Sequence, residues 1–176
     1  PAQSYGRAVF VASDAVIVLP YDPVRDRVLL VEQFRAGPLA RSDRAPWLLE
    51  PVAGLIDPGE TPEATARRET AEEAGITLDG LIEIARFYPS PGASSDYFYT
   101  YLGLCDLSDG VAGHHGNPDE GEDIATHLLS FDAAMAAVAS GAIRTGPLIL
   151  ALYWLARERP ALRRGEMPVR CSTSQT

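Results

Sequence analysis

The sequence contains only two cysteines and no long hydrophobic run, and both shortages exclude classes of protein. Cys105 and Cys171 are too few for a disulfide framework and have no metal-ligand spacing, so we expect a reducing compartment, with the cytoplasm as the default. The longest apolar run, from Pro147 to Ala156, is far too short to span a bilayer. The first residues lack the charged start and the cleavage site of a signal peptide. We therefore expect no membrane partner.

Positive charge is also scarce. The 176 residues include 15 Lys and Arg against 24 Asp and Glu, which gives a formal net charge of −9. This balance argues against a nucleic-acid partner, because affinity for nucleic acid rests on basic side chains that neutralise phosphates. A small anionic substrate would be repelled too, unless a divalent cation reversed the local sign of the charge. An acidic composition and the use of a metal are therefore compatible.

The remaining composition fits one folded unit. Hydrophobic residues make up 46% of the chain, which is enough for a full core, and the length does not require a second domain. Glycine and proline fall between periodic segments, without internal repeats or low-complexity linkers. We predict a single domain over residues 1–163 and a flexible tail over residues 164–176.

The order of strand-like and helix-like segments predicts the fold class. Predicted strands cover residues 7–12, 15–20, 27–34, 47–56, 81–88, 97–104 and 126–131. Predicted helices run from the N-cap Thr61 to Gly75, from the N-cap Ser130 to Gly141, and from Pro147 to Arg159, where Pro160 follows. An acidic, glycine-containing loop occupies residues 106–123. This order predicts an α+β fold with a mixed β-sheet core sandwiched between α-helices.

The helix after Thr61 carries three carboxylates on one face. At about 100° per residue, Glu69, Glu72 and Glu73 fall within one wedge, with Glu69 and Glu73 one turn apart. Like charges at this spacing destabilise a helix unless water or a cation neutralises them. Mg²⁺ takes carboxylate and carbonyl oxygens and shares its other sites with water and substrate phosphates. Arg68, four residues before Glu72, is placed to form an ion pair with it.

Taken alone, this helix is most simply a solvated surface with partial arginine pairing, as most Glu-rich helices are. The spacing of the surrounding residues changes that balance, because it follows the pattern G-x₅-E-x₇-R-E-U-x-E-E-x-G-U, where U is aliphatic. At these positions the sequence resembles the Nudix hydrolase family, and the matching residues are Gly54, Glu60, Arg68, Glu69, Glu72, Glu73, Gly75 and Ile76. One departure is Thr70, where the family usually has an aliphatic residue. The resemblance implies a Nudix fold and metal-assisted hydrolysis of a diphosphate.

The same resemblance implies a role for each residue of the motif. Glu69 and Glu73 should be metal ligands, joined by the carbonyl of Ala53, while Glu72 is a supporting ligand. Glu60 should orient the loop, and Gly54 and Gly75 are structural members of the motif. The expected cofactor is Mg²⁺, with Mn²⁺ as a possible substitute.

Other segments resemble one group within the family, the bacterial ADP-ribose pyrophosphatases. These segments are residues 19–26, 31–35 and 47–50, the turn at residues 87–96, and residues 120–124 and 143–149. By the resemblance, Arg35 should contact the diphosphate or ribose, since a guanidinium offers forked donors to anionic oxygens. Glu50 is a further candidate for substrate binding, and Ser90, Pro91 and Gly92 should line the ribose end. Asp96 stands where relatives often carry Glu.

The acidic loop supplies candidates for the general base. By composition alone it is a solvated loop, but relatives carry a catalytic glutamate there, and Glu120 is the first choice, with Glu122 as a metal ligand or as the base itself. His114 and His115 are interpreted as facing water. The catalytic set expected is therefore Glu120, Glu122, Glu72 and Arg68.

The expected reaction is hydrolysis of ADP-ribose to AMP and ribose 5-phosphate. The nearest alternative is another nucleoside diphosphate sugar, such as GDP-mannose, as the small-molecule partner. A non-catalytic ligand sensor with the same fold is a third hypothesis, although such a protein would be expected to lose motif carboxylates. We also expect a homodimer.

Overall fold

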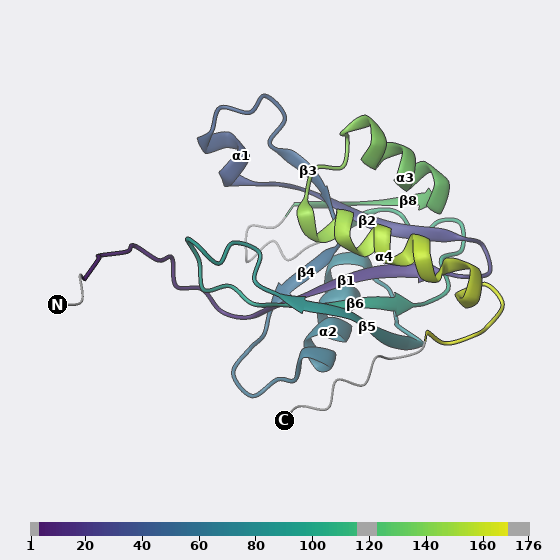
Figure 1. The fold of residues 1–176 in the computed structure, drawn as a ribbon. Helices are drawn as coiled ribbons and strands as arrows, with labels where there is room; N and C mark the ends of the chain where they lie inside the picture. Colours follow the sequence, from purple (N-terminus) through teal and green to yellow (C-terminus); the bar gives the residue numbers. More distant parts are fainter. Residues whose placement is uncertain (1–3, 116–122, 169–176) are drawn as a thin grey trace.

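A computed structural model of the chain describes residues 4–115 and 123–168. This part of the chain contains eight strands and four helices, and Figure 1 shows how they are arranged. The strands are β1 (Ala15–Asp22), β2 (Arg27–Phe34), β3 (Trp47–Glu50), β4 (Val52–Leu55), β5 (Gly80–Phe87), β6 (Phe98–Leu104), β7 (His114–His115) and β8 (Ile124–Ser130). The helices are α1 (Ala36–Ala40), α2 (Pro62–Ala74), α3 (Phe131–Ser140) and α4 (Gly146–Leu162). In the described residues, no helix is long and apolar enough to cross a membrane.

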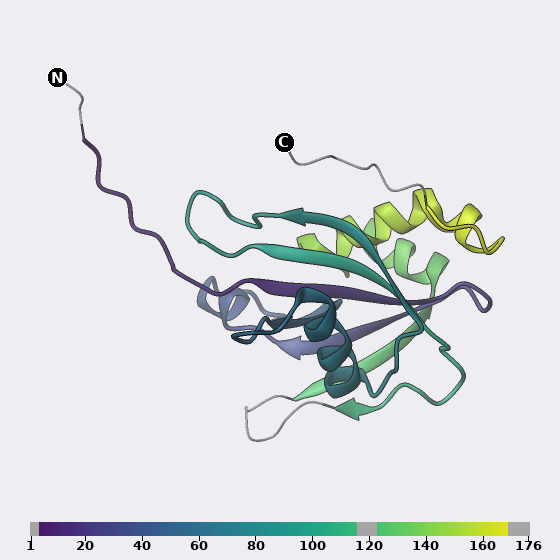
Figure 2. The same ribbon diagram turned by 90° about the horizontal axis from the view of Figure 1, so that it is seen from below.

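The strands form one mixed sheet, in the order β5-β6-β1-β2-β8-β7. β1 and β6 pair in parallel and the other pairs are antiparallel, with β3 added to β2 and β4 added to β1. Helix α2 covers one face of this sheet, and α3 and α4 cover the other (Figures 1 and 2). The predicted α+β arrangement, a mixed sheet between helices, is confirmed.

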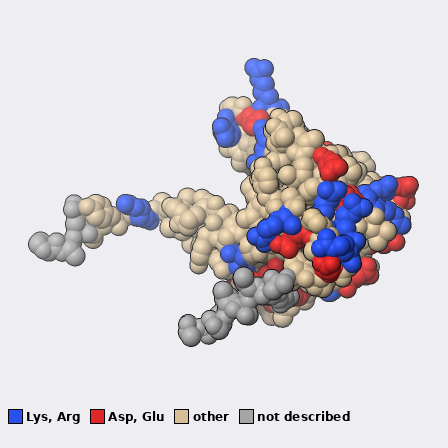
Figure 3. All heavy atoms as spheres, turned by 45° about the vertical axis from the view of Figure 1, so that its right-hand side comes forward, with Lys and Arg blue, Asp and Glu red and all other residues tan. Residues whose placement is uncertain are grey.

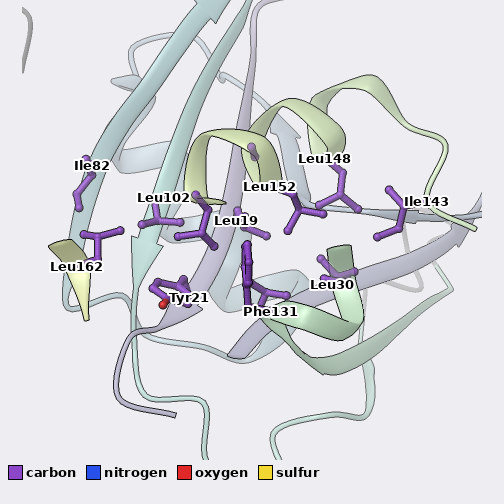
Figure 4. Close-up of a cluster of buried hydrophobic side chains, with 14 residues drawn as sticks. Leu19, Tyr21, Leu30, Ile82, Leu102, Phe131, Ile143, Leu148, Leu152 and Leu162 are labelled. Atoms are coloured by element: carbon purple, nitrogen blue, oxygen red, sulfur yellow. The ribbon is translucent and has the colours of Figure 1, made fainter. Parts of the chain in front are cut away.

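The two central strands supply a hydrophobic core on each face of the sheet. On β1, Val16 and Val18 belong to the core beneath α2, whereas Leu19 and Tyr21 belong to the core beneath α3 and α4. This alternation follows the two-residue period of a strand. Figure 4 shows the core beneath α3 and α4, where Leu148 and other side chains of α4 pack against those of the central strands. Burial on both faces explains why β1 is a continuous apolar run.

An ion-pair network holds the β1–β2 turn to the helices at one end of the molecule. Asp26 has a left-handed φ of 59°. Its carboxylate accepts hydrogen bonds from the Tyr21 hydroxyl and from the guanidinium of Arg159, and Arg163 Nη1 lies 3.3 Å from Asp26 Oδ2. Arg159 also stacks on the ring of Phe131, 4.4 Å from its centre. On the face shown in Figure 3, basic side chains lie beside acidic ones in this way. Ion pairs therefore stabilise this end of the molecule. The cavity described below lies at the other end of β1 and β2.

The predicted strand over residues 47–56 is wrong in one respect, because the segment forms two strands. Pro51 separates β3, which pairs with β2, from β4, which pairs with β1. Proline lacks the N–H that a continuous ladder would need at that position. The split separates the partners of β1 and β2, and it brings Ala53 and Gly54 beside α2, since α2 packs on β4.

Three other predictions also need correction, and one helix was not predicted. Residues 7–12 form no strand beyond a single bridge from Phe10 to Ser94, because Val9, Phe10 and Val11 are exposed and have no sheet to pack on. The short helix α1 was not predicted. The acidic loop contains the short strand β7, and His115 packs against Gly75 rather than facing only water. Helix α4 continues through Pro160 to Leu162, since a proline in the last turn removes only one internal hydrogen bond.

Candidate active site

Helix α2 forms where its end signals predict it. The hydroxyl of Thr61 accepts a hydrogen bond from the Ala64 N–H, and Pro62 occupies the first helical position. Gly75 ends the helix in a left-handed conformation, with a φ of 64°. Thr70, the departure from the motif, is fully buried, and its hydroxyl donates to the Ala66 carbonyl. The helix is therefore fixed at both ends and presents its carboxylates at defined positions.

Two of these carboxylates lie against strand β4. The Ala53 N–H donates to the Glu73 carboxylate over 3.1 Å, and Glu73 is only 2% exposed. Glu69 lies so close to Gly54 that a Cβ atom added there would stand 2.0 Å from the Glu69 Oε1 atom. Glycine at position 54 is therefore required by the approach of a carboxylate to the strand. Helix and strand together set the positions of Glu69 and Glu73.

Arg68 connects the remaining acidic side chains of the motif. Its guanidinium donates to both carboxylate oxygens of Glu60, at 3.1 and 3.0 Å, and to Glu69 at 2.7 Å. The predicted ion pair with Glu72 is present, with 3.0 Å between Arg68 Nη1 and Glu72 Oε2. Arg68 also donates to the Leu55 carbonyl at 3.3 Å. One cation therefore joins the helix to the loop before it and partly neutralises the carboxylate cluster.

These contacts lower the pKa of the Glu60 carboxylate. Hydrogen bonds from Arg68, and then from the Thr65 hydroxyl, lower the pKa of Glu60 from 4.5 to about 2. The same bonds to Glu60, with the charges of Glu69 nearby, raise the pKa of Arg68 above its ordinary value. Both groups therefore stay charged through the physiological range, and the loop keeps its bond to the helix.

The donor atoms at this site fit a hard divalent cation. They are carboxylate oxygens of Glu69, Glu72 and Glu73, and the cradle at Gly54 holds one of them where any larger residue would displace it. Across residues 4–115 and 123–168, no three acidic, histidine or cysteine side chains already surround a single point. A Mg²⁺ ion does not require three, because it keeps several waters and shares its sites with substrate phosphates.

A cavity of about 540 Å³ opens beside Glu69. The motif contributes Ala53, Gly54, Arg68 and Glu69 to its wall. Asp96, which stands where relatives often carry Glu, also lines the cavity. The neutral and partly apolar part of the lining includes Ala12, Ser13, Ala15, Ile17, Phe98, Thr145 and Pro147. A volume of this size is within the range of small-molecule sites. A cavity lined by both charged and apolar side chains suits a ligand that carries both anionic and uncharged parts.

Arg35 and Glu50 meet at the wall of the same cavity. Arg35 Nε lies 2.8 Å and Nη2 2.7 Å from one carboxylate oxygen of Glu50, which is largely buried. This pairing fixes the direction of a guanidinium that carries five N–H donors in all. The structure thus brings two predicted substrate contacts, Arg35 just after β2 and Glu50 at the end of β3, to the cavity that Glu69 also lines.

Other predicted site residues lie elsewhere. Ser90, Pro91 and Gly92 are exposed and are not among the lining residues of the cavity, so their contact with a substrate stays a prediction. Glu72 is about half exposed and Glu73 is buried behind the strand, and neither lines the cavity. Glu120 and Glu122 lie outside the described residues.

Several lining residues were not singled out by the sequence. Thr145 and Pro147 lie within residues 143–149, a segment that carried the resemblance, so its Arg-Thr-Gly-Pro turn was an available signal. Asp57 lies inside the motif, between Gly54 and Glu60. Ala12 and Ser13 had no local signal, because Ala12 is held by Ser95, which is distant in the sequence.

Comparison with known proteins agrees with this geometry. The Nudix domain family model matches residues 12–150, a range that includes the whole motif and most of the cavity wall. The chain belongs to the Nudix family. A Nudix relative from Escherichia coli K12, an ADP-ribose pyrophosphatase, is 40% identical over 157 residues, covering 89% of this chain and 74% of that protein. The ADP-ribose pyrophosphatase of Haemophilus influenzae is 38% identical over 151 residues, covering 85% of this chain and 69% of that protein.

More distant matches extend to other members. A GDP-mannose pyrophosphatase from Citrobacter koseri is 30% identical over 149 residues, covering 85% of this chain and 76% of that protein. A solved structure of an ADP compounds hydrolase superposes with a TM-score of 0.62 at 22% identity, covering 82% of this chain and 74% of that one. That structure supports the Nudix fold, and the sequence relatives support a hydrolase.

Proposed function

We propose that this Nudix protein hydrolyses ADP-ribose to AMP and ribose 5-phosphate. The proposal is supported by relatives of that activity at 38–40% identity, which are more similar than the GDP-mannose pyrophosphatase at 30%. The single structural observation behind it is the cavity, because the motif carboxylate Glu69 and the paired guanidinium of Arg35 face the same space. A diphosphate placed there would lie between acidic and basic groups.

The residues of the chain have distinct roles in this reaction. Arg35, oriented by Glu50, donates hydrogen bonds to the diphosphate or to the adjoining ribose. Arg68 positions Glu69 and Glu72, and Glu60 secures Arg68 from the loop side. Ser90, Pro91 and Gly92 remain proposed contacts for the ribose end. The apolar wall of the cavity accommodates the uncharged parts of the nucleotide and excludes water from them.

The chemical step is a displacement at phosphorus. The oxygen of a water molecule attacks one phosphorus of the diphosphate, and the bond from that phosphorus to the bridging oxygen breaks. Glu120 takes the proton from the attacking water, and Glu122 is the alternative base. The bridging oxygen leaves with the second phosphate, so one water and one ADP-ribose give AMP and ribose 5-phosphate.

Nudix ADP-ribose pyrophosphatases generally use a divalent metal. We propose Mg²⁺ here, with Mn²⁺ as a substitute, held by Glu69, Glu73 and the Ala53 carbonyl, with Glu72 and Glu122 as further ligands. When bound, such a cation neutralises the diphosphate and lowers the pKa of a coordinated water. We further propose a cytoplasmic homodimer without nucleic-acid or membrane partners.

A substrate panel tests the proposal. ADP-ribose, ADP-glucose and GDP-mannose are each incubated with the protein, with and without Mg²⁺, and the released phosphomonoesters are measured after phosphatase treatment. We expect the highest kcat/KM with ADP-ribose, and only with the metal present. A higher kcat/KM with GDP-mannose than with ADP-ribose would identify the protein as a hydrolase of GDP-mannose instead. Binding of nucleotides without turnover would indicate a ligand sensor.

A further inference from the structure

One side of the cavity is built from a segment that belongs to no strand or helix. Ala12 and Ser13 line the cavity, yet residues 11–14 have no regular secondary structure. The residues before them, Val9, Phe10 and Val11, are at least half exposed. In Figure 2 this N-terminal segment leaves the sheet and runs away from the rest of the molecule. At its C-terminal end the Asp14 carbonyl accepts a hydrogen bond from the Ile56 N–H at 3.0 Å. The position of Ala12 at the cavity must come from further specific contacts, because Ala12 is in no strand or helix.

The hydroxyl of Ser95 supplies the contacts nearest to the wall. Its oxygen accepts a hydrogen bond from the Ala12 N–H at 3.0 Å, and the same hydroxyl donates to the Ala12 carbonyl at 3.2 Å. Both backbone polar groups of a cavity-lining residue are thus satisfied by one side-chain atom. Serine can do this because a hydroxyl is donor and acceptor at once.

The turn that carries Ser95 is itself well defined. The Ser90 carbonyl accepts hydrogen bonds from the Ala93 and Ser94 N–H groups, each at 3.0 Å. Phe10 exchanges two further backbone bonds with this turn, from its N–H to the Ala93 carbonyl at 2.8 Å and from the Ser95 N–H to its carbonyl at 3.0 Å. The turn therefore binds the N-terminal segment at two successive points, Phe10 and Ala12.

We propose that Ser95 is a positioning residue for nucleotide binding, which acts by holding the Ala12–Ser13 wall of the cavity. The inference rests on the proposed function, because it assumes that the cavity receives the substrate. It also gives the turn over residues 87–96 a second role. Although Ser90, Pro91 and Gly92 do not line the cavity, the turn borders it through Asp96 and also shapes it through the segment that it binds.

The position of Ser95 predicts an effect on KM rather than on kcat. The Ser95 hydroxyl binds the wall residue Ala12 and does not lie among the motif carboxylates. Its removal should therefore weaken the binding of the substrate and of the transition state equally. Two part-buried backbone groups lose their partner in Ser95→Ala. We expect KM for ADP-ribose to rise about fivefold to tenfold, with kcat within about twofold of the wild type.

Two further variants complete the experiment. Ser95→Thr keeps the hydroxyl and should restore KM to within about twofold of the wild type. Ser140→Ala removes a hydroxyl that also donates to a carbonyl, but on α3 and outside the cavity, and should leave both constants unchanged. Hydrogen exchange without substrate provides an independent readout, because the Ala12 amide should exchange faster in Ser95→Ala than in Ser140→Ala.

The outcomes separate this inference from the proposed function. If the wild type hydrolyses ADP-ribose but Ser95→Ala keeps its KM or its Ala12 protection, the positioning role is wrong and the function stands. An equal rise of KM in Ser95→Thr would also overturn the role of the hydroxyl. If the wild type hydrolyses no nucleotide sugar, the proposed function fails, and a slow-exchanging Ala12 amide in Ser95→Ala would overturn the structural role separately.

Discussion

The close approach of Glu69 to Gly54 shows how one residue without a side chain sets the geometry of the site. A Cβ at position 54 would stand 2.0 Å from the end of the Glu69 side chain, and that end is flexible. The strand itself would not need to move. The demand for glycine here comes from the carboxylate, and the turn before α2 has a separate glycine, Gly59, with a φ of 91°.

Gly54→Ala should therefore inactivate the protein without unfolding it. The new methyl displaces the Glu69 carboxylate, and a misplacement of that size costs about a hundredfold in kcat/KM. The melting temperature should change by less than about 4 °C, because only a flexible side chain has to move. Hydrolysis of ADP-ribose and thermal melting measure the two effects.

Gly80→Ala is the matched control for that substitution. A Cβ at position 80 would meet Leu104 at an ordinary 3.7 Å, at the start of β5 and outside the cavity wall. Its kcat/KM should equal that of the wild type. Full activity in Gly54→Ala would mean that the position of Glu69 does not matter for the reaction.

At the scale of residues, the sequence predicted the charged part of the site better than its apolar wall. Arg68 and Glu72 are four positions apart on one helix, so their ion pair follows from helix geometry alone. Ala12, which lines the cavity next to Ser13, is hydrogen-bonded to Ser95, 83 positions away along the chain. A contact of that separation leaves no local pattern in the sequence.

Helix α2 and the loop before it act as a single element, because Glu60 bonds to both Thr65 and Arg68. The pKa of Glu60 is lowered from 4.5 to about 2 by these partners. A carboxylate whose pKa falls on folding adds stability that is fully present above pH 4.5 and is lost as the pH falls toward about 2. The loop–helix connection should therefore weaken in acid within this window.

Glu60→Gln tests the connection through the melting temperature measured from pH 6 to pH 2. Wild type should melt above the variant at pH 6, and the difference should shrink between pH 4.5 and about 2, because the wild-type carboxylate becomes protonated there. Glu158→Gln removes a carboxylate that, in the part of the chain that the structure describes, pairs with the exposed Arg157, and it should keep the wild-type acid dependence. A constant difference between wild type and Glu60→Gln across this range would contradict the assignment.

The ends of a helix or strand were predictable where residues next to those ends set them. They were not predictable where contacts with distant parts of the chain set them. Helix α2 begins after Thr61 and ends at Gly75 as predicted, since both caps act on their own helix. The division at Pro51 depends on β3 and β4 pairing with different strands, which the sequence of the segment does not reveal. Helix α4 passes Pro160 because Leu162 is buried in the core beneath it.

At the scale of the whole molecule, a net charge of −9 has to be reconciled with an anionic substrate. Of the acidic face of α2, Glu69 lines the cavity, and Arg68 neutralises only part of that face. A bound divalent cation would reverse the local sign and attract a diphosphate against the overall charge. The central claim is therefore that carboxylates of α2 bind such a cation.

Calorimetric titration of Mn²⁺ into the wild type and into Glu69→Gln, with and without AMP, tests this claim most directly. We predict saturable Mn²⁺ binding by the wild type and an affinity at least about tenfold lower in the variant, because one anionic oxygen ligand becomes a neutral amide. Absence of Mn²⁺ binding by the wild type even with nucleotide, or equal affinity in the two proteins, would contradict it.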